Sequence, residues 1–191
     1  CHHAGMLASS PMNPAPNLVL VGPMGAGKTS IGKRLATRLG LVFVDCDHRL
    51  EEVTGAPVPL IFECEGEAGF RARETALIAE LMRGEGQLVA TGGGAVLAEA
   101  NRERLKARGF VVHLQVSVDQ QIERLARDRT RPLLAVGDKR SRLEAMAIER
   151  GPIYRDVADF TFDADGLAVA VAAERLGALL EQRWQRAAVT P

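Results

Sequence analysis

Five short apolar runs, separated by longer amphipathic stretches, limit how this chain can fold. The runs are NLVLVG (17–22), LVFVD (41–45), QLVATG (87–92), FVVHLQV (110–116) and ADFTFDA (158–164). Their apolar residues are largely consecutive rather than alternating, which is typical of strands that are buried on both faces. Because helical patterns fill the stretches between them, we expect an α/β fold of three layers, with helices on both faces of a parallel sheet.

Composition excludes several classes of protein. The chain has 191 residues, 47% of them hydrophobic, which is enough for one buried core. Lys plus Arg and Asp plus Glu are both 24, so no net field favours nucleic acid or an anionic membrane. The chain has three cysteines, Cys1, Cys46 and Cys64, and no two of them form a C-x-x-C pair. This argues against a disulfide framework and against a zinc site. With no run of about 18 apolar residues and no signal-peptide pattern, we expect a cytoplasmic protein. We also expect it to act as a monomer.

The organisation along the chain is simple. Residues 1–16 (CHHAGMLASSPMNPAP) are small, polar and proline-rich, and we expect a disordered leader there. Residues 17–186 are expected to form one domain. Periodicity is weakest over residues 54–70 and 127–141, which makes these two stretches candidates for mobile segments.

The strongest motif follows the first apolar run. GPMGAGKTS (22–30) fits the pattern G-x-x-x-x-G-K-[ST], with an apolar strand before it and the helical stretch KTSIGKRLATRLG after it. An accidental glycine turn is the alternative, but this context favours a P-loop that binds a nucleoside triphosphate and Mg²⁺. In such a loop backbone amides surround phosphate oxygens, the lysine reaches the β and γ phosphates, and the hydroxyl binds Mg²⁺. The expected nucleotide-contacting residues are Gly25, Ala26, Gly27, Lys28, Thr29 and Ser30.

Two aspartates stand at the end of the second apolar run. Asp45 and Asp47 are two residues apart, so on a strand they would project to the same side. We expect Asp45, with Thr29, to hold Mg²⁺, and Asp47 to accept the proton of an attacking hydroxyl group. An N-cap of the following helix is the alternative for Asp47.

A glycine cluster follows the third run. TGGG (91–94) has three consecutive glycines, which favour a place where backbone amides approach a ligand closely at the carboxyl end of a strand. A flexible turn into the next helix is the alternative. The ends of the first three runs should lie along one edge of the sheet, and this favours the ligand-binding interpretation.

Taken together, these motifs resemble the shikimate kinase family. From about residue 17 to residue 184 the chain carries GPMGAGKTSIGKRLA, DCD, IFECEGEAGFRARE, GGGAV, RPLL and RGPIYRDVAD, in order and at suitable spacing. The resemblance implies a P-loop kinase fold with a five-stranded parallel sheet, similar to nucleoside monophosphate kinases. It also implies transfer of the γ-phosphoryl group of ATP to the 3-hydroxyl group of shikimate, in chorismate and aromatic amino-acid biosynthesis.

The resemblance also implies roles for individual residues. Asp45 matches the Mg²⁺-linked aspartate, and Asp47 matches the one that holds the shikimate hydroxyls. The other matches are Arg71 and Arg150 on the shikimate carboxylate, Gly92, Gly93 and Gly94 beneath the ring, catalytic Arg131 on the phosphates, and Arg124 near the adenine.

Within this frame a substrate-binding segment covers about residues 46–76 and a lid about residues 126–142, a stretch rich in Arg and Lys that is expected to close when both substrates bind. Arg73 lies about 200° round a helix from Arg71 and is expected to be structural. Two prolines in APVP (56–59) depart from the family pattern and favour a stiffer or later start of the substrate-binding segment.

Two other functions remain open. Another small P-loop kinase, such as a gluconate kinase, would share the phosphate-binding residues but lack the combined FR, GGG and RPLL pattern. A non-catalytic ligand-sensing domain would need an attached effector segment, which a leader of 16 residues does not supply.

Overall fold

A computed structural model describes residues 14–126 and 138–185 of the chain. One five-stranded sheet forms the centre, in the order β2–β3–β1–β4–β5, and every pairing is parallel. The strands are β1 (Asn17–Val21), β2 (Val42–Asp45), β3 (Gln87–Ala90), β4 (Gly109–Gln115) and β5 (Phe160–Asp163). Each lies within two or three residues of a run named above, so the expected parallel sheet is confirmed.

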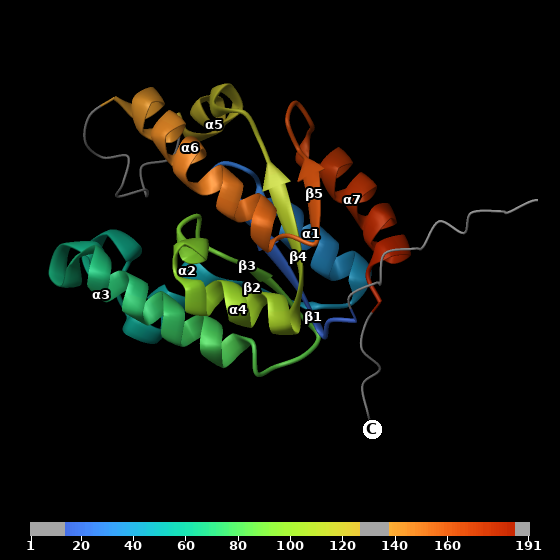
Figure 1. The fold of residues 1–191 in the computed structure, drawn as a ribbon, viewed down its shortest axis with the longest axis horizontal. Coiled ribbons are helices and arrows are strands. Elements are labelled where there is room, and N and C mark those ends of the chain that lie inside the picture. The colour runs from blue at the N-terminus through green and yellow to red at the C-terminus, as the bar shows by residue number, and fades with distance from the viewer. Residues whose placement is uncertain (1–13, 127–137, 186–191) are drawn as a thin grey trace, which may run out of the picture.

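Helices connect the strands and cover both faces of the sheet (Figure 1). They are α1 (Lys28–Leu39), α2 (Cys46–Thr54), α3 (Val58–Leu81), the short 3₁₀ helix η1 (Ala95–Leu97), α4 (Glu99–Arg108), α5 (Val118–Leu125), α6 (Lys139–Val157) and α7 (Val169–Arg183). α1 packs against α7 on one face, and α3 packs against α4 on the other. The three-layer α/β architecture is confirmed.

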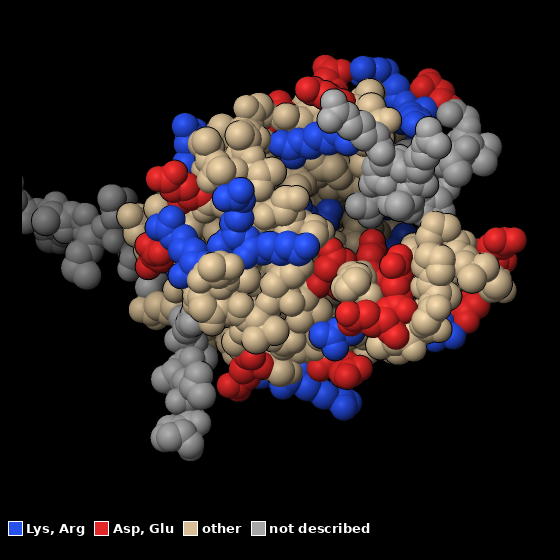
Figure 2. Space-filling view, turned by 180° about the vertical axis from the view of Figure 1, so that it is seen from behind, with Lys and Arg blue, Asp and Glu red and all other residues tan. Residues whose placement is uncertain are grey.

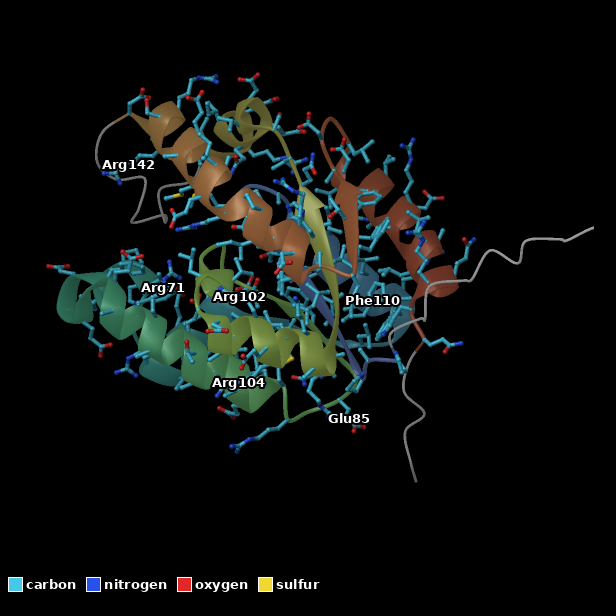
Figure 3. All side chains as sticks on the ribbon, in the orientation of Figure 1. Arg71, Glu85, Arg102, Arg104, Phe110 and Arg142 are labelled. Atoms are coloured by element: carbon cyan, nitrogen blue, oxygen red, sulfur yellow. The ribbon has the colours of Figure 1, made fainter. Side chains whose placement is uncertain are left out.

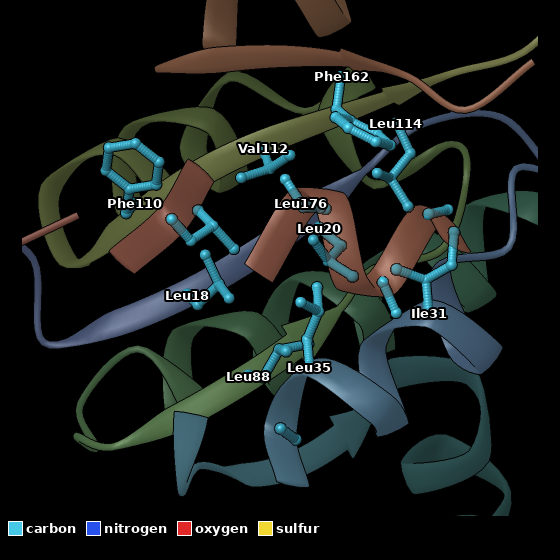
Figure 4. Packing of buried hydrophobic residues seen from close by; sticks show 14 of the residues in the cluster. Leu18, Leu20, Ile31, Leu35, Leu88, Phe110, Val112, Leu114, Phe162 and Leu176 are labelled. Carbon is cyan, nitrogen blue, oxygen red and sulfur yellow. The ribbon is translucent and has the colours of Figure 1, made fainter. Parts of the chain in front are cut away.

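Alternate residues of the central strand feed two cores. Leu18 and Leu20 belong to the core beneath α1 and α7, where they join Leu35 and Leu176 (Figure 4). Val19 belongs, with Val21, to the core beneath α3, α4 and α6. All of these side chains are at most 1% exposed. The strand is therefore apolar at each of its positions from Leu18 to Val21, because both of its faces are covered.

The expected irregular stretch at residues 54–70 is largely helical. α2 extends to Thr54, and α3 begins at Val58 with Pro57 as its N-cap and a proline in its first turn, where the missing N–H is tolerated. Gly66 then has φ 72° inside α3, which bends the helix. Because the helix changes direction there, no single apolar face runs through it, and this explains the weak periodicity.

The packed domain begins earlier than expected. Ala15, assigned above to the leader, is 2% exposed, and its carbonyl oxygen accepts a hydrogen bond of 3.0 Å from the Trp184 indole. The carbonyl oxygen of Pro16 accepts from the Gly86 amide at 3.0 Å. These contacts show that the boundary predicted at residue 16 is wrong. Short apolar runs do not reveal hydrogen bonds of this kind, which join the backbone to distant residues. Residues 1–13 lie outside the described residues. Within the described ranges no helix is long and apolar enough to cross a bilayer.

His113 on β4 makes stability depend on pH. Its side chain is 3% exposed and stacks on Tyr154, with 5.2 Å between ring centroids. Burial, together with the positive charges of Arg155 and Lys28, lowers the pKa of His113 to about 4. The unfolded chain therefore takes up a proton near pH 6.5, whereas the folded chain takes it up only near pH 4.

His113→Phe should remove this pH dependence. As the pH falls from 6.5 toward 4, the wild-type protein should lose up to about 3 kcal/mol of unfolding free energy through this histidine. The variant keeps an aromatic ring against Tyr154 but has no titrating group there. Urea unfolding of both proteins at pH 7 and pH 4.5 measures the difference, and equal pH dependence in the two would contradict the assignment.

Candidate active site

The ends of β1, β2 and β3 lie at one edge of the sheet, as the sequence predicts. Asp45 is paired with Ala90, and Leu20 is paired with Ala90 on the other side, so the three strands end in register. Residues that follow these strands therefore lie close together at the carboxyl edge of the sheet (Figure 1). Figure 2 shows the surface hollowed at this edge, with acidic side chains gathered on one side of the opening.

The P-loop adopts the conformation that its glycines allow. Gly22 has φ 148°, and a Cβ atom at this position would lie 2.5 Å from the carbonyl oxygen of Leu114. Only glycine lets the chain pass so close to β4. α1 then begins at Lys28, whose ammonium group donates hydrogen bonds of 2.7 and 2.8 Å to the carbonyl oxygens of Gly22 and Pro23. The loop thus places a lysine and a helix N-terminus at one point, which is a phosphate-binding arrangement.

Asp45 and Asp47 converge by a geometry different from the one expected. β2 ends at Asp45, and α2 begins at the next residue, so Asp47 lies in the first turn of a helix and not on a strand. Asp45 is the N-cap, because its carboxylate accepts from the His48 amide at 3.1 Å. The alternative of an N-cap at Asp47 is therefore wrong, and so is the two-residue strand periodicity. Thr29 donates to the other oxygen of Asp45 at 2.5 Å, which links the P-loop to β2.

A cavity of about 230 Å³ opens beside these aspartates. It brings together side chains from α2, α3 and α6 and the glycines that follow β3. Its lining residues are Met24, Asp45, Asp47, His48, Glu51, Val58, Phe62, Phe70, Arg71, Glu74, Gly92, Gly93, Gly94 and Arg150. The lining combines apolar side chains with charged side chains of both signs, which suits a small organic acid that also carries hydroxyl groups.

Arg71 is held in the cavity by a buried acid. It projects from α3, and its guanidinium donates to Glu74 at 2.9 Å (Figure 3). Glu74 is only 1% exposed. Burial raises the pKa of Glu74 above its usual value, the Arg71 charge opposes this rise, and the Asp47 carboxylate adds to it. Arg73 faces elsewhere and pairs with the surface residue Glu65 at 2.6 Å, as expected from its angle round the helix.

The three glycines after β3 leave room for these charged groups. A Cβ atom on Gly92 would lie 2.9 Å from Glu74 Oε2 and 3.1 Å from Asp47 Oδ1. A Cβ atom on Gly94 would overlap the Arg71 guanidinium, at 2.6 Å from Cζ. The close approach of charged side chains therefore requires glycine at positions 92 and 94.

A second cavity, of about 350 Å³, lies over the P-loop. Arg124 lines it and donates to the carbonyl oxygens of Gly25 at 2.9 Å and Leu167 at 3.2 Å. These bonds tie α5 to the P-loop and to the chain that precedes α7. The residues common to both cavities are Met24, Asp45, Asp47, Gly92 and Gly93. The two cavities therefore share one wall, and Asp45 and Asp47 form part of that wall.

Most of the predicted site residues line one or both of these cavities, whereas Ala26 lines neither. Arg150 on α6 is 6% exposed and lines the first cavity, whereas Arg131 lies outside the described residues. Sequence reasoning missed Glu74 and Tyr154. Glu74 follows Arg71 by three residues and Tyr154 follows Arg150 by four, and both are helical contact spacings that a search around the arginines would have found.

Comparison with known proteins identifies the family. The family model for shikimate kinase matches residues 24–180. Shikimate kinase from Stenotrophomonas maltophilia (strain K279a) is 53% identical over 180 residues, which cover 94% of this chain and 100% of that protein. The structure of shikimate kinase from Acinetobacter baumannii in complex with shikimate is similar with a TM-score of 0.83 and 46% identity, covering 88% of this chain and 95% of that chain.

A more distant structure extends the likeness of fold alone. Deoxyadenosine kinase from M. mycoides with bound dATP has a TM-score of 0.57 at 14% identity, over 86% of this chain and 99% of that chain. The expected P-loop kinase fold is confirmed by both structural likenesses. With a matching family model over most of its length and a relative more than half identical, the chain belongs to the shikimate kinase family.

Proposed function

We propose that this protein transfers the γ-phosphoryl group of ATP to the 3-hydroxyl group of shikimate, a step in chorismate and aromatic amino-acid biosynthesis. The observation that carries the proposal is the wall shared by the two cavities. ATP occupies the cavity over the P-loop, and shikimate occupies the smaller cavity. The phosphoryl group therefore passes from ATP to shikimate beside Asp45 and Asp47. Family membership supports the choice of acceptor.

The acceptor cavity supplies groups that match each part of shikimate. Arg71 and Arg150 provide guanidinium groups for the ring carboxylate, and arginine binds a carboxylate with two parallel hydrogen bonds better than lysine does. Asp47 accepts the proton of the attacking hydroxyl group as the phosphoryl group transfers. The apolar side chains of Phe62 and Phe70 cover the ring and exclude water.

Thr29 and Asp45 fit Mg²⁺. Both offer hard oxygen donors beside the P-loop, and the two side chains touch. Mg²⁺ takes one or two protein ligands and keeps several waters, so two oxygen donors are enough for its site. When bound, the ion would offset the negative charge of the phosphate groups. Thr29 and Asp45 would hold it beside the P-loop.

Asp45→Asn should raise the Mg²⁺ requirement. Asparagine still caps α2, since its side-chain oxygen accepts from the His48 amide as the carboxylate does. The lost negative charge weakens the hold on a divalent cation, and we expect the Mg²⁺ concentration for half-maximal activity to rise about tenfold. A Mg²⁺ titration of activity at saturating ATP measures this, and an unchanged midpoint would contradict the role.

An ADP-release assay with three acceptor conditions tests the function itself. We expect turnover with shikimate, and only background ADP release with gluconate or without an acceptor. Turnover with gluconate alone would identify another small-molecule kinase. Binding of shikimate without turnover would favour a ligand-sensing domain. Monomeric state, cytoplasmic location and the role of Arg131 stay predictions from the sequence.

A further inference from the structure

Tyr154 contacts the glycine triplet through its hydroxyl group. The residue lies on α6, is 3% exposed, and donates a hydrogen bond of 2.5 Å to the carbonyl oxygen of Gly93. Its ring stacks on His113, with an angle of 24° between the two planes. Burial raises the pKa of Tyr154 to about 12, so its hydroxyl group remains a donor at physiological pH. None of the roles proposed above uses this side chain.

The hydrogen bond fixes the one carbonyl group of the triplet that local backbone does not hold. The Gly92 carbonyl oxygen accepts from the Ala95 amide at 3.1 Å, and that of Gly94 accepts from the Leu97 amide at 3.1 Å. These bonds belong to the turn that leads into η1. Among the described residues, the Gly93 carbonyl is held by a side chain 61 positions away in sequence.

Holding this carbonyl also sets the direction of an N–H group. The described residues contain no cis peptide bond, so the carbonyl of Gly93 and the amide of Gly94 point in opposite directions. Tyr154 and His113 line a neighbouring cavity of about 200 Å³, which shares Met24 and Arg150 with the acceptor cavity, whereas Gly93 and Gly94 line the acceptor cavity. With its carbonyl turned toward Tyr154, the peptide turns the Gly94 N–H away from Tyr154.

Gly94 makes this peptide easy to reverse. Its φ and ψ are −95° and 0°, and rotation of the preceding peptide by half a turn takes φ into the left-handed region, which glycine enters freely. A side chain at position 94 would oppose that rotation, but it would overlap the Arg71 guanidinium. Because Arg71 lies so close, a side chain at position 94 cannot fix the peptide. The hydrogen bond from Tyr154 fixes it instead.

We propose that Tyr154 is a positioning residue that keeps the Gly93–Gly94 peptide turned with its N–H toward the acceptor and its carbonyl away. The reversed peptide would present a carbonyl oxygen to an acid that carries a carboxylate, and an electronegative oxygen repels that group. The proposal rests on the proposed function, because it assumes that shikimate occupies the cavity of about 230 Å³.

Tyr154→Phe tests the proposal, since it removes the hydroxyl group and keeps the ring against His113. We expect the KM for shikimate to rise about tenfold, which is the effect of one well-placed hydrogen bond, while the KM for ATP and kcat stay within about twofold. An unchanged KM for shikimate, or a parallel rise in both KM values, would overturn the proposal.

His113→Phe is the matched control. It alters the same packed layer without touching the Tyr154 hydroxyl group, and its KM for shikimate should stay within about twofold of wild type. A rise equal to that of Tyr154→Phe would show a general packing effect and would overturn the proposal.

A binding measurement separates this inference from the proposed function. The Gly94 amide resonance of the wild-type protein should shift when shikimate is titrated in, and the shift should shrink in Tyr154→Phe. If wild-type protein binds no shikimate by calorimetry, the proposed function fails. If both proteins bind shikimate equally tightly with the same Gly94 shift, the inference about Tyr154 fails alone.

Discussion

Replacing Lys28 with alanine is expected to lower kcat by at least about a thousandfold while the fold stays intact. The ammonium group lies at the first turn of α1, hydrogen-bonded to the P-loop carbonyls, and we propose that its charge serves the transferring phosphoryl group. The core side chains of α1 include Ile31 and Leu35, both at most 1% exposed, and the substitution does not change them. ADP release with shikimate measures the loss, and a thermal melt checks the fold.

Lys106→Ala provides the matched control for this experiment. Lys106 lies on α4 and forms an exposed ion pair of 3.7 Å with Asp156, which contributes little to stability. Its removal should leave both kcat and the melting temperature unchanged. Activity near the wild-type level in Lys28→Ala would show that the P-loop assignment is wrong.

Replacing Asp47 with asparagine should have the next largest effect. The amide has nearly the same shape and fits the first turn of α2, but it cannot accept the proton of the attacking hydroxyl group. We expect kcat to fall by a hundredfold to a thousandfold, with ATP binding unchanged, because Asp47 is not among the residues proposed to hold the phosphates. Steady-state kinetics with shikimate and a direct ATP-binding titration measure the two quantities.

Glu52→Gln makes the same chemical change on the same helix. Glu52 is exposed, pairs with His48 and Arg49, and lines neither substrate cavity, so its substitution should leave turnover unchanged. Asp45→Asn provides a second comparison. If Asp45→Asn and Asp47→Asn showed the same kinetic changes at every Mg²⁺ concentration, the assignment of separate roles to the two aspartates would be wrong.

Sequence reasoning predicted the parts of this protein that depend on local pattern. Consecutive apolar residues predicted the buried strands, and the spacing of Gly22, Gly27 and Lys28 predicted the P-loop, because both features arise from residues close together in the chain. The convergence of the strand ends followed from the parallel sheet, which places all carboxyl ends at one edge.

The errors arose where one element meets another. β2 passes directly into α2 with no linker, so the spacing of Asp45 and Asp47 had to be interpreted with a helical and not a strand period. Glu74 lies in a run of charged residues that is typical of an exposed helix face, yet it is buried against the glycine triplet. The spacing of three residues indicates its contact with Arg71, but only tertiary structure places the pair against Gly92 and Gly94.

The shared wall between the two cavities has an energetic consequence for how the substrates bind. The residues that line both cavities are Met24, Asp45, Asp47, Gly92 and Gly93, so an effect of one bound substrate on the affinity for the other has a direct route through them. Such coupling is reciprocal by thermodynamic necessity: whatever factor ATP applies to the Kd of shikimate, shikimate applies to the Kd of ATP. A titration of either substrate in the presence and absence of the other therefore gives the same coupling free energy.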